Sequence, residues 1–138
     1  MELAFQISLF SSRITTMSTV DFQHISTSMV GEVAVVEILA KELRFPHQAQ
    51  ELGTELTLVA GQGWAKQLLV NMKHVKYLSS TGFAVLLKLV KQAKDQGSNL
   101  KFCNLDPEVR IGADIIGLDK VATLCGTEHE AIKEFAGK

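Results

Sequence analysis

The fold is decided by residues 67–103, which read QLLVNMKHVKYLSSTGFAVLLKLVKQAKDQGSNLKFC. The segment opens with an apolar run, Gln67 to Met72, whose short length and continuous hydrophobicity predict a strand covered on both faces. After the turn Leu78 to Gly82, apolar residues recur at helical spacing and predict an amphipathic helix that ends near Gly97. Asn99 to Asn104 predicts the next strand. A strand, a helix and a second strand in this order predict a right-handed parallel unit.

The residues upstream of this unit predict a hairpin and a helix. Phe22 to Ser28 alternates polar and apolar side chains, which is typical of an edge strand. Val33 to Leu39 is short and rich in β-branched residues, so it predicts a second strand, joined to the first by a turn at Met29 to Glu32. Pro46 suits the first turn of a helix, and apolar residues at helical spacing extend that helix to Ala60.

Helices and strands continue to alternate toward the end of the chain. Pro107 opens a helix that runs toward Ile116, Val121 to Leu124 predicts a short strand, and Thr127 caps a last helix. This alternation predicts an α/β fold with one mixed, mostly parallel sheet of about four to five strands and about four helices. The 138 residues suit a single domain.

Composition and charge argue against several classes of function. Hydrophobic residues make up 46% and charged residues 21%, as in globular domains, and the formal net charge of −1 gives no drive toward nucleic acid or acidic membranes. No apolar run is long enough to span a membrane. Cys103 and Cys125 lie in separate apolar stretches, which favours two buried free thiols in a reducing, cytoplasmic compartment. Because no paired Cys/His spacing occurs, we expect no metal site and no cofactor.

The first residues stand apart from this pattern. We expect residues 1–17 to be an N-terminal extension and residues 18–138 to form the domain. The stretch from Leu3 to Phe10 is apolar but follows no basic residue, so a signal peptide is not predicted. Three alternatives stay open for the extension: Met17 as the true start, an additional ordered strand, or a frayed tail.

The turn Leu78-Ser79-Ser80-Thr81-Gly82 carries the chemistry. A Ser or Thr between a strand and a helix caps the free N–H groups of the first helical turn, and this structural role needs no further function. A single cap does not explain three consecutive hydroxyls followed by a glycine. The same helix N-terminus also favours an anion, and a phosphate on a hydroxyl there would add about −1.5 to −2 charge. From the residues alone, a cap and a cap combined with a phosphorylation switch are equally favoured.

The order of these pieces resembles the STAS domain of bacterial anti-sigma factor antagonists. In that family an apolar strand leads into a D-S-S/T-G-L-type turn and an amphipathic helix, and a strand, a proline-containing helix and a GL-D-K-V-like close follow. Here the last pieces are Asn104-Leu105-Asp106-Pro107 and Gly117-Leu118-Asp119-Lys120-Val121. The resemblance extends over residues 18 to 138.

The resemblance implies a cytoplasmic regulator of transcription that acts by binding and performs no catalysis. Its partner would be an anti-sigma factor or a histidine-kinase-like serine kinase, and phosphorylation would block the binding. Aligned on Gly82, the phosphorylated position is Ser80, and Thr81 fills the S/T position that follows. The implied partner-binding residues are Ser79, Ser80, Thr81, Gly82 and Phe83. Arg44, in a turn that meets this one in the family, would pair with the phosphate.

Three departures from the family pattern leave alternatives open. Where the family usually has an acid before the phosphorylated serine, this sequence has Ser79. Arg44 replaces the acid of the G-E-L-D turn, and Asn71 replaces the acid that ends the strand. A kinase surface matched to an acidic site would fit these residues poorly. The alternatives are a scaffold subunit of a signalling complex that is never phosphorylated and a weak nucleotide-binding module. The sequence carries no signal for an oligomeric state.

An enzyme is not expected. His74 precedes Ser80 in the sequence, but the G-x-S-x-G elbow of hydrolases is absent. The other histidines, His24, His47 and His129, show no metal-ligand spacing and are expected on the surface.

Overall fold

The computed structural model describes residues 22–137, which form two sheets and five helices. The main sheet has five strands in the order β1-β2-β4-β6-β7. They are β1 (Ile25–Val30), β2 (Val33–Ile38), β4 (Gln67–Asn71), β6 (Asn99–Cys103) and β7 (Thr123–Cys125). Strand β1 is antiparallel to β2, and all other neighbours are parallel. The mixed, mostly parallel sheet predicted from the sequence is therefore confirmed.

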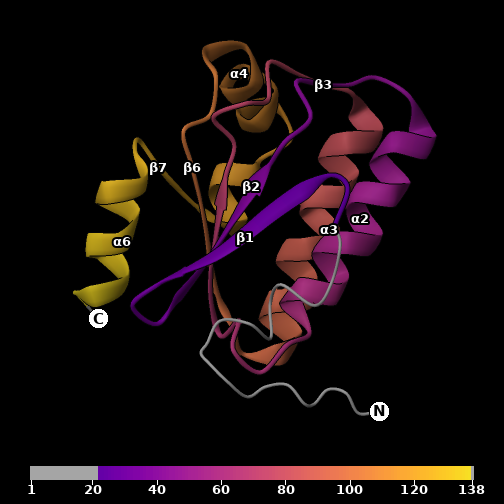
Figure 1. Ribbon diagram of the computed structural model, residues 1–138. Helices are drawn as coiled ribbons and strands as arrows, with labels where there is room; N and C mark the ends of the chain where they lie inside the picture. The colour runs from indigo at the N-terminus through magenta and orange to yellow at the C-terminus, as the bar shows by residue number, and fades with distance from the viewer. Residues whose placement is uncertain (1–21, 138) are drawn as a thin grey trace, which may run out of the picture.

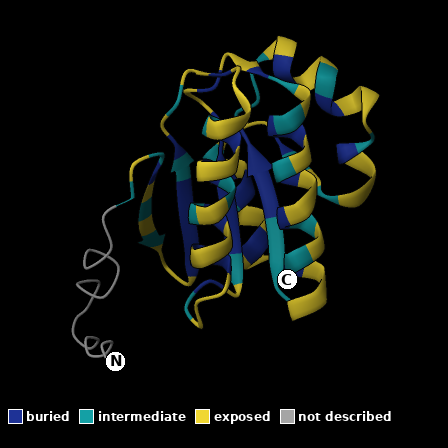
Figure 2. Cartoon of the chain, turned by 90° about the vertical axis from the view of Figure 1, so that its right-hand side faces the viewer, coloured by how far each residue is buried: buried dark blue, intermediate teal, exposed yellow. Residues whose placement is uncertain are grey.

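The helices are divided between the two faces of the sheet. They are α2 (Pro46–Ala60), α3 (Ser80–Gln96), α4 (Pro107–Ile115), α5 (Leu118–Val121) and α6 (Glu128–Ala136). Figure 1 shows α2 and α3 side by side on one face of the sheet and α6 on the other. Figure 2 shows that α2 and α3 turn their exposed residues outward and that the strands behind them are buried.

Two clusters of buried side chains hold these layers together, and strand periodicity assigns residues to them. Val33 and Val35 of β2 belong to the cluster on the α6 side, with Leu69, Cys103 and Phe135. Ala34, Val36 and Ile38, at the alternate positions of the same strand, pack toward α2 and α3. The strand β4 is buried on both faces, as its apolar sequence predicted. Each fully buried Val or Leu contributes about 1.5–3 kcal/mol relative to exposure.

The structure moves several predicted boundaries, and the first strand begins at Ile25 instead of Phe22. Strand β1 continues through Val30, so the hairpin turn is only Gly31-Glu32, with Gly31 at φ 61°. A two-residue hairpin that matches the strand twist needs a positive φ, which glycine adopts without strain. Val121 belongs to the short helix α5, and the last strand begins at Thr123. The apolar residues within 121–124 did not distinguish the end of a helix from a strand.

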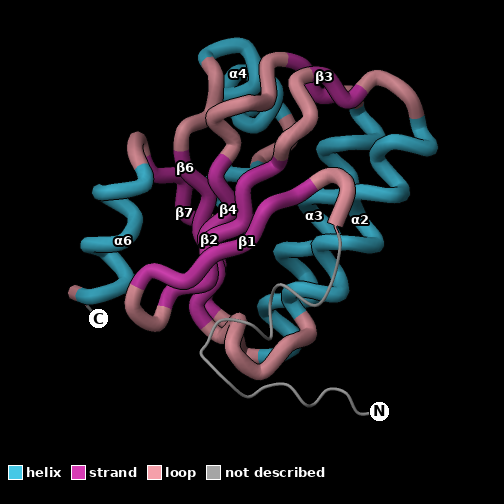
Figure 3. Tube along the Cα trace, viewed as in Figure 1, coloured by secondary structure: helices cyan, strands magenta, loops and turns pink. Residues whose placement is uncertain are grey.

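A second, small sheet was not predicted. The strands β3 (Glu42–Leu43) and β5 (Tyr77–Leu78) have two residues each and pair in parallel. Figure 3 shows β3, α4 and neighbouring loops gathered at one end of the main sheet. This small sheet places the segment after β2 beside the turn that begins α3.

Candidate functional site

Ser79 is the N-cap of α3. Its side-chain oxygen accepts a hydrogen bond of 3.2 Å from the N–H of Gly82, and its carbonyl accepts one of 2.9 Å from the N–H of Phe83. Its extended backbone, with φ −72° and ψ 170°, is the conformation that an N-cap requires. The capping role expected of this turn is therefore confirmed and belongs to Ser79.

Ser80 and Thr81 are the first two helical residues, and they differ in exposure. Ser80 is exposed, whereas Thr81 is half-buried. Because Ser79 already satisfies the N–H of Gly82, the N–H groups of Ser80 and Thr81 are left as the donors of the first helical turn. An oxyanion on Ser80 would lie beside these donors and at the positive end of the helix dipole.

Gly82 and Phe83 are buried parts of the packing around the turn. A Cβ atom added to Gly82 would lie 2.9 Å from Cγ of Leu78, so the space over this glycine is filled from within the chain. Phe83 is 8% exposed, and a Cβ on Gly112 of α4 would lie 2.7 Å from its Cζ. The Phe83 ring therefore fits against a glycine and fixes α4 to α3. Both residues are therefore buried in the packing that shapes the turn.

Arg44 directly follows β3, and the backbone pairing of the small sheet places it close to the capping turn. Its guanidinium lies 4.3 Å from the ring centroid of Tyr77, and its Nε donates to Oε1 of Glu42 at 2.8 Å. The hydrogen bond and the charge of Arg44 lower the pKa of Glu42, and Glu42 in turn raises the pKa of Arg44. Arg44 is thus held by Glu42 and Tyr77, and pairing with a phosphate would require it to leave this carboxylate.

Other basic side chains near the small sheet are also paired. Lys73 and His74 both contact the carboxylate of Glu37, at 3.5 Å and 3.3 Å. Lys76 lies 3.4 Å from Asp106. These pairs are exposed, so each contributes little to stability. The pairing of His74 with Glu37 gives no support to a role as a base for Ser80.

The contacts of Asn71 explain why an amide stands at this position instead of the acid that is usual in the family pattern. It is 1% exposed at the end of β4, and its Nδ2 donates to Oε1 of Glu128 at 2.8 Å. Its Oδ1 accepts from the N–H of Lys73 at 3.0 Å and from Nδ2 of Asn104 at 3.2 Å. A carboxylate could accept these two bonds but could not donate to Glu128. The amide therefore suits a neighbour that is itself an acid.

An apolar groove of about 330 Å³ adjoins Ser80 and was not found from the sequence. It lies between α3 and α4 and is lined by Tyr77, Leu78, Ser79, Ser80, Phe83, Ala84, Leu87, Gly112, Ile115 and Ile116. Ile115 is 79% exposed and the nearby Ile111 61% exposed. The sequence feature that could have indicated this groove is a pair of isoleucines, four residues apart, on one face of a short helix.

The comparisons with known proteins identify the family. The model of the STAS domain matches residues 24–131. The chain belongs to the STAS domain family. Among solved structures, the STAS domain resembles an anti-sigma-factor antagonist domain protein from Planctomyces limnophilus, with 20% identity and a TM-score of 0.69. That match covers 80% of this chain and 95% of the other.

Three further solved structures show the same fold. The unphosphorylated anti-sigma factor antagonist SpoIIAA is 21% identical, with a TM-score of 0.67, and the match covers 83% of this chain and 97% of that one. SpoIIAA of Bacillus is also known in a phosphorylated form, which matches at 20% identity, 80% and 98% coverage and a TM-score of 0.62. A chain of the stressosome is 19% identical, with 81% and 96% coverage and a TM-score of 0.62.

The cysteines of the STAS domain are not paired in a disulfide. Cys103 and Cys125 are free, buried and opposite each other on β6 and β7, as expected for free thiols. Within residues 22–137 no cluster of three metal-ligating side chains occurs, and no helix is long and apolar enough to cross a membrane. The expected extension, residues 1–17, lies outside the described residues.

Proposed function

We propose that this STAS domain is an anti-sigma factor antagonist-like regulator that docks an anti-sigma factor or histidine-kinase-like serine kinase through the Ser79–Phe83 turn. Phosphorylation of Ser80 would release the partner. The observation that carries this proposal is that the two serines have different structural roles. Ser79 is used by the helix cap, whereas Ser80 is exposed at the rim of an apolar groove.

The groove supplies the contact surface that such a regulator needs. Ile115, Ile116 and Leu87 are exposed by 79%, 39% and 36% beside Ser80. A partner that covers these side chains would also desolvate the rim of the groove. A phosphate of about −1.5 to −2 charge on Ser80 would lose its hydration when the partner docks, and this cost opposes docking.

The fold would tolerate the modification. A phosphate on Ser80 gains from the N–H donors and the positive end of α3, and the Ser79 cap stays in place. The change would therefore be confined to the surface that the partner contacts, with the domain still folded.

The charged side chains around the turn indicate which kind of partner surface would be complementary to it. Lys41, Arg44, Lys73 and Lys76 lie in the connections that flank β3 and β5. Three of these four cations have a carboxylate partner on this chain, and Lys41 has none among residues 22–137. A partner with an acidic rim around an apolar centre would complement this surface better than one built for an acidic antagonist.

The second candidate is a scaffold subunit that is bound constitutively and never phosphorylated. The observation that favours it is the fixed position of Arg44, which is paired with Glu42 and stacked on Tyr77. The likeness to a stressosome chain agrees with this candidate, although at 19% identity it reflects the fold.

The test compares matched serine variants in binding to a purified kinase-class partner from the same organism. Ser80→Asp should weaken binding at least about tenfold, which corresponds to 1.4 kcal/mol. Ser28→Asp, an exposed position on the edge strand β1, is the control and should bind like the wild type. Unchanged binding of Ser80→Asp, with the control also unchanged, would argue against the switch.

A further inference from the structure

A second and larger groove lies on the other side of Leu87, away from Ser80. Its volume is about 740 Å³, within the range of about 300–1,000 Å³ that is usual for small-molecule sites. One wall is the C-terminal half of α3, and the other is α5 with the start of β7. The residues that line it are Leu87, Val90, Lys91, Ala93, Lys94, Asp95, Ser98, Asn99, Leu100, Lys120, Val121, Ala122 and Thr123.

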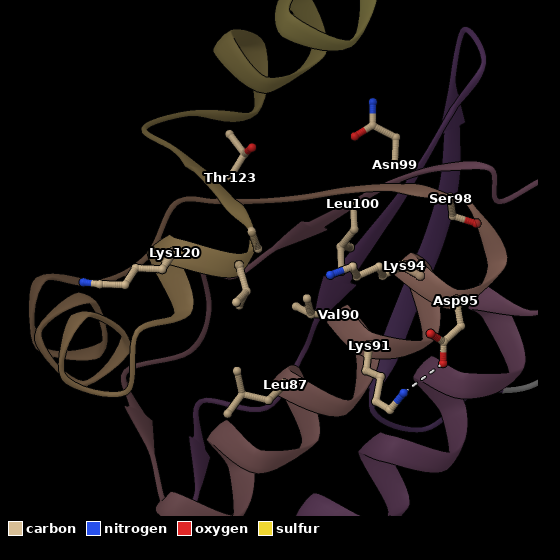
Figure 4. A pocket seen from close by; sticks show the side chains of 13 residues that line it. Leu87, Val90, Lys91, Lys94, Asp95, Ser98, Asn99, Leu100, Lys120 and Thr123 are labelled. Carbon is tan, nitrogen blue, oxygen red and sulfur yellow. Dashed lines mark hydrogen bonds and ion pairs between the residues drawn. The ribbon is translucent and has the colours of Figure 1, made fainter.

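The middle of this groove is apolar. Leu87 and Val90 face it from α3, and Leu100 faces it from β6 (Figure 4). Val121 of α5 also lines it. Val121 is 56% exposed and Leu87 36% exposed. An unbranched apolar chain lying along the groove would remove these side chains from water, which is the main source of affinity in apolar sites.

The ends and rim of the groove are basic. Three lysines line it against one acid, although the whole chain has a net charge of −1. Asp95 is already paired with Lys91 at 3.1 Å. Lys94 and Lys120 take part in no ion pair within residues 22–137. Figure 4 shows the Lys94 side chain extending over the groove toward Leu100, whereas Lys120 extends outward from the opposite wall. An anionic group would find its counter-charge at Lys94.

We propose that this groove binds a small anionic amphiphile: a medium-chain carboxylate, with the carboxylate at Lys94 and the chain along Val90, Leu87 and Val121. The length agrees with this class. Leu87 and Lys94 are separated by about two helical turns, or about 11 Å along α3. The site shares only Leu87 with the Ser80 groove, and the proposal does not rest on phosphorylation or on a protein partner.

The experiment is an NMR titration of the isotope-labelled full chain with decanoate, kept below its micelle concentration. Amide shifts should concentrate on α3 from Leu87 onward and on residues 118–124. Decyltrimethylammonium has the same tail and the opposite charge, and butyrate has the same head and almost no tail. Both should bind at least about tenfold more weakly than decanoate.

Two variants and one control separate specific binding from surface adsorption. Lys94→Glu and Val121→Asp change exposed side chains and should each weaken decanoate binding at least about tenfold. Lys133→Glu, on the exposed face of α6, should leave it unchanged, and circular dichroism verifies that all three variants are folded.

Three results would overturn the proposal. The first is equal affinity for the anionic and cationic amphiphiles, and the second is binding that survives both groove variants. The third is the absence of decanoate shifts in this groove while an acidic amphipathic peptide does bind there. That last result would assign the groove to a protein partner.

Discussion

The N–H of Ser79 donates a hydrogen bond of 3.0 Å to the carbonyl of Leu43. This bond joins the cap of α3 to the end of β3, two segments that are far apart in the sequence. It continues the short parallel pairing in which Leu43 stands opposite Leu78. One serine thus holds the helix start with its side chain and the small sheet with its backbone, and the neighbouring Ser80 is left at the surface.

The cap predicts different effects for the two serines on stability. Ser79→Ala removes the acceptor for the N–H of Gly82 and should lower the free energy of unfolding by about 1 kcal/mol. Ser80→Ala should change it by less than about 0.5 kcal/mol, because Ser80 is exposed. Urea denaturation of the two variants measures the difference. Equal losses would mean that the cap is not specific to Ser79.

The buried amide of Asn71 predicts a pH-dependent defect. In Asn71→Asp the carboxylate would face Glu128 in a buried place, so its folded-state pKa would rise above the unfolded value. The protonated acid can still donate to Glu128, so the variant should resemble the wild type near pH 4. The deficit should grow as pH rises and reach about 1–3 kcal/mol at pH 7.5. Urea denaturation at both pH values, with the wild type in parallel, tests this; a deficit independent of pH would contradict it.

The Cys103 thiol predicts a loss of stability in alkali. Burial, and then the charge of Glu128, raise its pKa from 9.0 to about 12. The unfolded chain therefore loses this proton first, and the stabilising contribution of the neutral thiol is complete below about pH 9 and falls between about pH 9 and 12. Cys103→Ala should have a shallower decline over this window than the wild type. If the two slopes were the same, the thiol would not be the titrating group.

The sheet was predictable because its signals are local and repeated. The apolar run of β4, the helical spacing of α3 and the β-branched run of β2 each extend over five or more residues, and each lies where it was predicted. The capping turn was also predictable, because serine before a helix has one dominant structural use. Which of the two serines forms the cap followed only from the hydrogen bonds.

The parts that were missed depend on contacts between distant segments. The pairing of β3 with β5 involves two residues in each strand, too few for a periodic pattern. The direction of Arg44 is set by Tyr77, which lies on the other strand of that pair. The groove beside Ser80 arises from the contact of Phe83 with Gly112, and nothing in either local sequence indicates that contact.

The groove beside Ser80 predicts a variant that separates docking from folding. Ile115 is 79% exposed, so Ile115→Glu should leave the free energy of unfolding within about 0.5 kcal/mol of the wild type. It should nevertheless weaken binding of the kinase-class partner at least about tenfold, because a charge would enter the apolar contact. Calorimetric titration gives the affinity, and Leu58→Glu, an exposed leucine on α2, is the matched control. Equal weakening by the control would show that Ile115 is not part of the docking surface.

The proposal that Ser80 is a switch is tested most directly by intact-mass and peptide-mapping spectrometry of the protein isolated from its own cells. We predict one phosphate, mapped to Ser80, in a fraction of the molecules that changes with growth conditions. We also predict its absence in Ser80→Ala and its presence in Ser79→Ala. A protein that carries no phosphate in any condition, or carries it on Ser79 or Thr81, would contradict the switch and favour the scaffold subunit.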